Sequence, residues 1–461
     1  MSERTRLGLA VLGAALALGV LGDLLLRETP WGLNWALWAF AFTAAAWLAG
    51  ARRPLLLLAL AYSALLLWRA SPMLATLNLA ASASALALAT APLRAGIASY
   101  AAAALRLAWN TGAGAVLVPA EVDWSDTPRG RWTGHAAAAA RGLAIAVPLV
   151  LVFGGLFVAA DAVFENLVRD TLEIGNPMTH FGVIVLWAWL ACGFLRHALR
   201  PQEPVAAEAR RRLGRVETAV VLGCLDVLFL VFVLVQLRYL FGGQEHVVET
   251  TGLTYAEYAR RGFFELVAVA ALVVPLVLAA DALVRDEARR LFRVLSLALL
   301  ALLAVVMSSA LERMRLYTAE YGLTELRLYV TAFMAWLGLA LTWSLLSVFR
   351  DRRHDFMPGA ATAGFAVVLA LNVLNPDAVI VRTNLDRHFE RGRTLDVSYL
   401  TRLSADGAPE LASRVDRLQG LDRRLAVEWL DQLDRPRDRR TWNWGRWRAA
   451  DYVRRARAAY R

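Results

Sequence analysis

The chain contains no lysine, and cysteine and histidine are scarce. Its 461 residues include two cysteines and six scattered histidines. Cys192 and Cys224 each lie inside an apolar run, so neither a disulfide framework nor a thiolate metal site is expected. The motifs H-E-x-x-H and G-x-S-x-G and the P-loop are also missing. We therefore expect no metal and no cofactor, and the sequence predicts no catalytic residue.

Arginine carries all of the positive charge, and the formal net charge is +11. Nucleic-acid binding would need these arginines on one continuous surface. They stand instead beside apolar runs, where positive residues orient membrane helices. Hydrophobic residues make up 58% of the chain, more than soluble domains usually contain. The expected partner is a lipid bilayer, and nucleic acid is not expected.

The apolar residues are gathered into runs of about 18 to 25, which as helices cross a hydrocarbon core of about 30 Å. The predicted fold is all-α: a polytopic transmembrane bundle of about eleven spans, with ten or twelve also allowed because the third run is short. The predicted spans are Leu7–Leu26, Leu33–Gly50, Pro54–Trp68, Met73–Ala91, Gly142–Phe164, Phe181–Leu199, Val216–Phe241, Phe263–Val284, Leu291–Leu311, Leu328–Phe349 and Gly359–Leu374.

Two segments near the N-terminus need separate treatment. The first run follows Arg4 and Arg6 as a signal peptide would, but it is too long and has no clear cleavage site. We predict that it is a retained span. The stretch Ala95–Trp109 has an alanine-rich face and contains Arg106, a pattern that favours a helix lying on the membrane surface.

Arginines in the short loops predict the orientation. They concentrate in alternate loops, which by the positive-inside rule are cytoplasmic. We expect a bacterial inner-membrane protein with a cytoplasmic N-terminus and, after an odd number of spans, an extracytoplasmic C-terminal tail. The expected organisation is a four-span segment (1–94), a cytoplasmic or interfacial loop (95–141), a seven-span core (142–376) and a helical tail (377–461).

The tail is charged, and its apolar residues recur at helical spacing, as at Leu411, Val415 and Leu418. Its end is rich in tryptophan. Trp442, Trp444 and Trp447 are expected either to rest at the lipid headgroups or to pack on the tail's own helices.

A dense polar stretch, Ser309–Phe333, interrupts the apolar runs. Gly322 is placed to end one helix near Tyr321, and Thr324 to begin the next as its N-cap. Within the first helix, the spacing makes Glu312 a neighbour of Arg315, and Arg313 a neighbour of Tyr317. An earlier loop ending at Arg261 shares the letters Gly-Leu-Thr, which raises the possibility of duplicated hairpins.

The candidate site is on the outer face. Its charges form either a cradle for a ligand or a clamp for the tail, and the sequence leaves both open. The candidate residues are Arg260, Arg261, Glu312, Arg313, Arg315, Tyr317, Glu320, Glu325, Arg327, Arg382 and Asn384.

Asp226 is a separate candidate, because it lies near the middle of a predicted span. A carboxylate at that depth is a candidate functional group by default, although it can also be a protonated structural group.

Three stretches together resemble a bacterial integral-membrane family catalogued as domain of unknown function 4173, with the related 4153 group. They are "GLTYAEYARRGFFEL", "RMRLYTAEYGLTELRLY" and the segment from Asn375 to Leu411. The resemblance covers roughly Val216 to Leu411 and implies a shared membrane fold and outer site, but no reaction. The positions that it marks are Tyr258, Arg260, Gly262, Phe263, Tyr317, Gly322, Leu323, Thr324, Arg327, Arg382, Asn384, Asp396, Tyr399, Leu400 and Ser404.

Three functions remain open at this point. The first is a non-enzymatic scaffold, sensor or partner of another membrane or envelope protein. The second is a transporter or channel that uses Asp226. The third is an enzyme acting on a phosphate-bearing, lipid-linked substrate, with the outer arginines binding phosphate and Glu312 or Glu320 as base.

Overall fold

The computed structural model describes residues 2–91, 97–124, 177–200, 213–241, 263–350, 355–433 and 438–460, with isolated residues between 142 and 167. Within these ranges the regular secondary structure is helical, apart from one isolated bridge between Leu213 and Val284. Nine of the described helices are long and apolar enough to cross a membrane. The chain is therefore an all-α, multi-pass membrane protein, as the sequence predicts.

The membrane helices follow the predicted spans closely, except that α5 lies where the sequence predicts a surface helix. They are α1 (Glu3–Leu26), α2 (Leu33–Leu48), α3 (Arg53–Ala64), α4 (Pro72–Thr90), α5 (Ile97–Glu121), α8 (Pro177–Leu199), α9 (Arg215–Phe241), α12 (Phe263–Leu283), α13 (Arg289–Tyr321), α14 (Glu325–Phe349) and α15 (Phe356–Leu374). The helices α2 and α3 are the shorter apolar ones. The predicted span Gly142–Phe164 lies largely outside the described residues.

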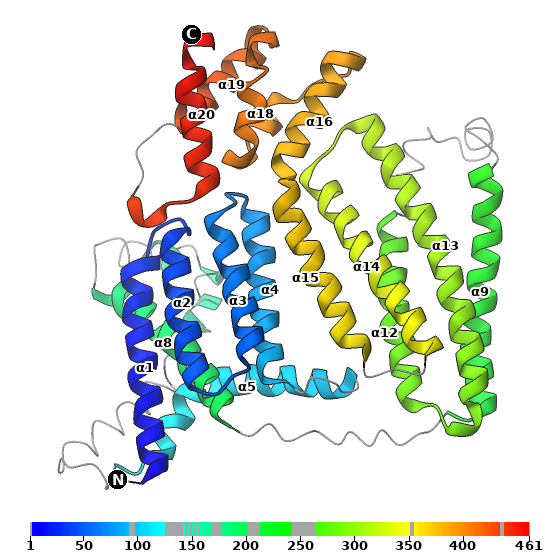
Figure 1. Cartoon of the computed structure of the whole chain (residues 1–461), viewed down its shortest axis with the longest axis horizontal. Coiled ribbons are helices and arrows are strands. Elements are labelled where there is room, and N and C mark those ends of the chain that lie inside the picture. The colour runs from blue at the N-terminus through cyan, green and yellow to red at the C-terminus, as the bar shows by residue number, and fades with distance from the viewer. Residues whose placement is uncertain are drawn as a thin grey trace.

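Helix α5 is longer than the predicted surface helix, because apolar residues continue beyond Trp109 and pack on α8. Gly114 lies so close to Gly193 of α8 that a side-chain carbon would not fit between the two backbones. Over Ser99–Glu121 the helix is also long and apolar enough to span a membrane. In Figure 1 the start of α5 lies across the lower end of α4, as a surface helix would.

The membrane helices form two groups (Figure 1). The first half consists of α1–α5 and α8, where Gly19 and Gly22 let α1 approach Ala188 and Trp187 of α8 closely. The second half consists of α9 and α12–α15. Its core is centred on α13, whose Leu299, Leu300 and Leu303 are fully buried.

The two halves meet where α4 packs on α15. A reciprocal amide pair joins them: Asn78 Nδ2 donates to Asn372 Oδ1 at 3.0 Å, and Asn372 Nδ2 donates to Asn78 Oδ1 at 2.8 Å. Both asparagines are completely buried. Because buried amides without partners are costly, this pair fixes the register between α4 and α15.

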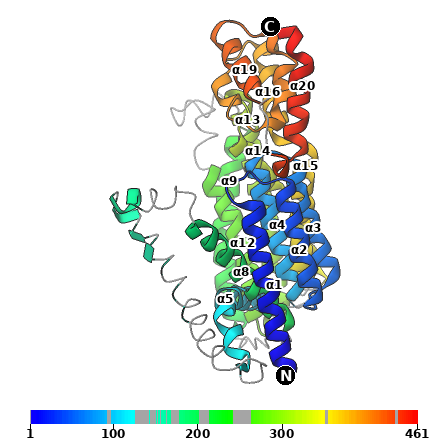
Figure 2. The ribbon, with the colours of Figure 1, turned by 90° about the vertical axis from the view of Figure 1, so that its left-hand side faces the viewer.

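The tail packs on the end of the bundle opposite the N-terminus (Figures 1 and 2). Its helices are α16 (Pro376–Arg391), α17 (Val397–Leu400), α18 (Ala408–Ala412), α19 (Gly420–Leu433) and α20 (Trp444–Tyr460). The chain passes from α15 into α16 through Asn375, which has a left-handed backbone with φ of 58°. The tail's apolar core includes Leu74 of α4, Leu328 of α14 and Leu371 of α15, so tail and bundle share one core.

The asparagine pair yields a test of the contact between the halves. Asn372→Leu should cost about 1–3 kcal/mol, since it leaves the buried amide of Asn78 without its partner. The double variant Asn78→Leu/Asn372→Leu should cost less than the single one, because no buried polar group is left unpaired. Unfolding of the purified protein in detergent measures both, and simply additive losses would contradict the pairing.

Candidate functional site

The turn between α13 and α14 is the first place where the tail contacts the bundle. Gly322 has a φ of 84°, which favours glycine, and Thr324 Oγ1 accepts from the N–H of Arg327 at 3.5 Å. The predicted helix end and N-cap are therefore where the sequence places them. Asn384 of α16 binds the turn at two points: Oδ1 accepts from Leu323 N at 3.1 Å, and Nδ2 donates to Leu323 O at 2.7 Å.

Arg387, one turn beyond Asn384, caps the end of α13. Its Nη2 donates to the carbonyl of Glu320 at 2.6 Å, where a cation is favoured by the helix dipole. The side chain is only 8% exposed, and its Nε has no hydrogen-bond partner within the described residues. Burial, together with the charge of Arg393, lowers the pKa of Arg387. No carboxylate pairs with this guanidinium in the described part of the chain.

Two further contacts clamp the same turn. Arg393 binds Glu320 through two nitrogens, at 3.0 and 3.2 Å. The hydroxyl of Tyr399 accepts from the backbone N–H of Glu325 at 2.8 Å, and burial raises the pKa of this phenol. Of the residues that the sequence proposes for ligand or tail binding, Glu320 and Glu325 contact the tail, and Asn384 is the tail residue that contacts the turn.

The remaining predicted residues of α13 and α14 hold the two helices together. The guanidinium carbon of Arg327 lies 4.0 Å from the centre of the Tyr317 ring, a cation–π contact, and Arg327 also donates to the carbonyl of Gly322. Arg313 donates to Gln236 of α9 at 3.0 Å. Tyr317 thus contacts Arg327 of α14, and its proximity to Arg313, which follows from helical spacing, stays a prediction.

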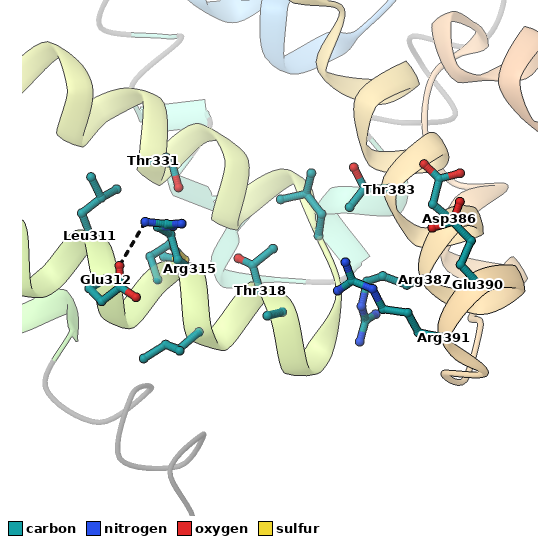
Figure 3. A pocket seen from close by; sticks show the side chains of 14 residues that line it. Leu311, Glu312, Arg315, Thr318, Thr331, Thr383, Asp386, Arg387, Glu390 and Arg391 are labelled. Carbon is teal, nitrogen blue, oxygen red and sulfur yellow. Dashed lines mark hydrogen bonds and ion pairs between the residues drawn. The ribbon is translucent and has the colours of Figure 1, made fainter. Parts of the chain in front are cut away.

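A cavity of about 660 Å³ opens between α13, α14 and α16 (Figure 3). Its lining is mixed. Apolar side chains come from the last turns of α13 and from the turn, and most of the charged ones come from α16. The lining residues are Leu311, Glu312, Met314, Arg315, Leu316, Thr318, Ala319, Leu323, Thr331, Thr383, Asp386, Arg387, Glu390 and Arg391.

Not all predicted site residues meet at this cavity. Glu312 and Arg315 line it and form the predicted ion pair at 3.2 Å. Arg382 is in the tail and pairs with Glu410 there. Arg260 and Arg261 lie outside the described residues, as does the loop that resembles the α13–α14 turn. Arg387 and Arg391 line the cavity but were not predicted, because nothing in the sequence shows which face of α16 meets α13.

Asp226 lies far from this site along α9. It belongs to the face that packs on α13, since Leu222 and Phe229, one turn away on either side, are buried. Neither carboxylate oxygen is accessible, and neither has a hydrogen-bond partner within the described residues. An ionised carboxylate in such surroundings would cost several kcal/mol, which is consistent with the structural role that the sequence also allowed.

A second docking point joins the tail to the first half. Asp406 Oδ2 accepts from the backbone N–H groups of Ala70 and Ser71 at 2.6 and 3.1 Å, and so caps the start of α4. Asp377 Oδ2 accepts from Ser404 N at 3.1 Å. Burial raises the pKa of both carboxyls, that of Asp406 to about 6. No sequence pattern links Asp406 with the loop before α4, which lies 335 or 336 residues earlier in the chain.

The tryptophan-rich end of the tail binds the same half. Asn443 Nδ2 donates to the carbonyls of Leu66 and Arg69 at 2.7 and 2.8 Å, and Leu33 N donates to Trp442 O at 2.9 Å. Trp444 and Trp447 stack on each other with ring centres 5.0 Å apart and stay 40% and 44% exposed. Contact with lipid headgroups remains a prediction for these rings.

Comparison with known proteins gives one result. A family model described as Domain of unknown function (DUF4153) matches residues 54–413, from α3 through α18, and so includes the cavity. The match is to the 4153 group and does not show membership of the related 4173 group, which the sequence also resembles. No curated protein and no solved structure matches this chain.

The α13–α14 turn can be tested with Gly322→Ala. An added carbon would lie 2.4 Å from Asn384 Oδ1 and 2.6 Å from Arg387 Nη1, and the backbone conformation, with φ of 84° and ψ of 174°, adds about 1–3 kcal/mol of strain. We expect faster proteolysis of the tail and a lower unfolding temperature. The control is Gly392→Ala, at φ of 63° and ψ of 21° with open space around it, which should cost only about 1 kcal/mol of left-handed strain. Equal losses in the two variants would contradict the docking.

Asp406 should make tail docking sensitive to pH. Its pKa in the folded protein, about 6, is above the ordinary value of 3.8, so its contribution to stability is complete below pH 3.8 and is lost as the pH rises through 6. The stability of the wild type relative to Asp406→Asn should therefore fall between about pH 4 and pH 7, by on the order of 1–3 kcal/mol. Unfolding temperatures across this range measure it. The exposed Asp416→Asn is the control and should show no such trend.

Proposed function

Because this chain belongs to the DUF4153 family, a domain of unknown function, we propose its role from the geometry: it is a non-enzymatic membrane protein that binds an amphipathic ligand in the cavity between α13 and the tail. Holding a lipid-like molecule at the membrane surface would suit a scaffold, sensor or partner of another membrane protein, the first of the three functions that the sequence leaves open.

The mixed lining of the cavity carries this proposal. On the α13 side, Leu311, Met314 and Leu316 offer an apolar surface. On the α16 side, Arg387 and Arg391 offer charge. Ligand sites in proteins are typically cavities of about 300–1,000 Å³ with mainly apolar walls and a few polar groups, and this cavity of about 660 Å³ fits that range.

The position of the cavity relative to a bilayer supports an amphiphile. Helix α13 has 33 residues and is therefore about 50 Å long, whereas the hydrocarbon core is about 30 Å thick. Its last turns, from Glu312 onward, extend past the hydrocarbon. A ligand in the cavity would have its apolar part near Leu311 and its polar part near the tail.

The sidedness of the site is part of the proposal. The end of the bundle that contains the N-terminus has arginine-rich connections, such as Arg52–Arg53 and Arg285–Arg293, and the positive-inside rule makes this end cytoplasmic. The tail and the cavity then face the outside of a bacterial inner membrane.

Catalysis and transport have less support. Glu312 and Glu320, the bases that an enzyme would need here, are each bound to an arginine, so each carboxylate is already engaged in an ion pair. Asp226 faces α13 inside an apolar contact between helices. The two glutamates are thus not arranged as free catalytic bases, and Asp226 is not arranged as a group on a transport path.

The proposal is tested by filling the cavity. Ala319 is exposed and lines it, so Ala319→Trp should block the ligand without disturbing the core. The purified full chain, released from nanodiscs of phosphatidylcholine and phosphatidylglycerol, is examined by native mass spectrometry for retained lipid. We expect the wild type to retain lipid and Ala319→Trp to retain several-fold less.

The matched control is Ala301→Trp, an exposed position on the same helix that does not line the cavity. It should retain as much lipid as the wild type. Loss of lipid in both variants, or retention in both, would refute binding in the cavity.

A further inference from the structure

Arg387 and Arg391 place two positive charges on the cavity without enough acid to balance them. Arg387 is buried, and Arg391 lies one turn further along α16 at the exposed rim. Neither has an ion pair within the described part of the chain. Figure 3 shows both side chains reaching from α16 toward α13. Two cations so close repel each other, and leaving them unpaired costs free energy unless an anion binds.

The acidic residues of the lining do not neutralise this pair. Glu312 is bound to Arg315 at 3.2 Å, and Asp386 is bound to Arg414, which lies outside the lining. Glu390 is the remaining acid of the lining. The negative charge of Glu390 can balance only one of the two arginines, so one positive charge is left over on the α16 side of the cavity.

Capping the end of α13 uses only one of the hydrogen-bond donors of the Arg387 guanidinium. Its Nη2 donates to Glu320 O, but Nε is buried and lacks a partner within the described residues. Nε has no accessible surface and so does not itself face the cavity, but Nη1 is not fully buried and makes no hydrogen bond within the described residues, so it is the N–H group that an acceptor in the cavity could reach. A phosphate oxygen is a good acceptor for a guanidinium with free N–H groups.

We propose that the cavity selects lipids with a net negative, phosphate-containing headgroup, which binds between Arg387 and Arg391 while an acyl chain lies along α13. This inference rests on the function proposed above and specifies its ligand. The apolar residues Leu311, Met314 and Leu316 line the cavity from the α13 side. They would contact the first part of the acyl chain. Since Arg387 contacts the very end of α13, about 13 Å beyond Leu311 by helical rise, a lipid held there is partly lifted out of the bilayer.

The experiment compares lipid retention from nanodiscs that contain equal amounts of phosphatidylglycerol and phosphatidylcholine, measured by native mass spectrometry on the full chain. The wild type should retain phosphatidylglycerol in preference to phosphatidylcholine, and high salt should reduce the preference. Arg391→Gln should lower it by at least about threefold, the size expected for one partly exposed ion pair. Arg391 has no described structural partner, so this variant should fold normally.

Two controls separate the charge at the cavity from charge in general. Arg423→Gln removes an exposed arginine of α19, away from the cavity, and should keep the preference. Arg387→Lys keeps the charge but loses the two-sided hydrogen bonding of a guanidinium, and should also lower the preference. An equal loss in Arg391→Gln and Arg423→Gln would overturn the assignment.

The two proposals fail in different ways. If the wild type retains lipid without a headgroup preference, the anion site is wrong and the binding function stands. If it retains no lipid, the proposed function itself is wrong. If millimolar inorganic phosphate displaces phosphatidylglycerol, free phosphate and not a lipid is the ligand, and the lipid proposal is overturned.

Discussion

The structure depends on how the open backbone groups at the helix ends are satisfied. Each helix leaves four N–H groups and four carbonyls without internal partners at its ends, and a helix end covered by protein must find these partners in side chains or other backbone groups. Here the tail supplies them. Asn384 and Arg387 bind the end of α13 and its turn, Asp406 binds the start of α4, and Asn443 binds the carbonyls that follow α3. The tail is therefore positioned by hydrogen bonds to main-chain atoms, and apolar contacts complete the fit.

This mode of docking explains why a charged tail can sit on apolar spans. Leu74, Leu328 and Leu371 of the bundle enter the tail's core, and around them the polar side chains of the tail mostly meet backbone groups, with the ion pair of Arg393 and Glu320 as an exception. It also explains the cavity: α16 approaches α13 closely only at its last turn, where Asn384 and Arg387 bind, and below this point the two helices leave space.

Much of the fold could be predicted from the sequence because its signals are local. Hydrophobic runs of the right length gave the spans, and Gly322 and Thr324 marked the turn between α13 and α14, since a left-handed residue and a helix cap leave distinct residue types at fixed spacing. The ion pair of Glu312 and Arg315 followed from helical spacing alone. The extent of α5 was not predicted, because its second part is explained by the close packing of Gly114 on Gly193, a contact between segments far apart in the chain.

The candidate site was predicted only in part, for the same reason. Residues on α13 and α14 were found because they form a conspicuous polar stretch, but Arg387 and Arg391 look like ordinary surface arginines of a charged helix. Their importance comes from burial and from which acids are already paired, and neither can be read from sequence. Asn78 and Asn372 are similar: each is a single amide in an apolar helix, and only their contact shows a role.

The reciprocal asparagine pair has a mechanical consequence. The tail is hydrogen-bonded to the first half through Asp406 and Asn443. It is hydrogen-bonded to the second half through Asn384 and Arg387. It therefore bridges the two halves across the contact between α4 and α15. Any change in the angle between the halves would therefore have to stretch or break some of the tail's hydrogen bonds to one half or to the other. The cavity lies beside the contacts with the second half, so its shape depends on the same hydrogen bonds that set the relative position of the two halves.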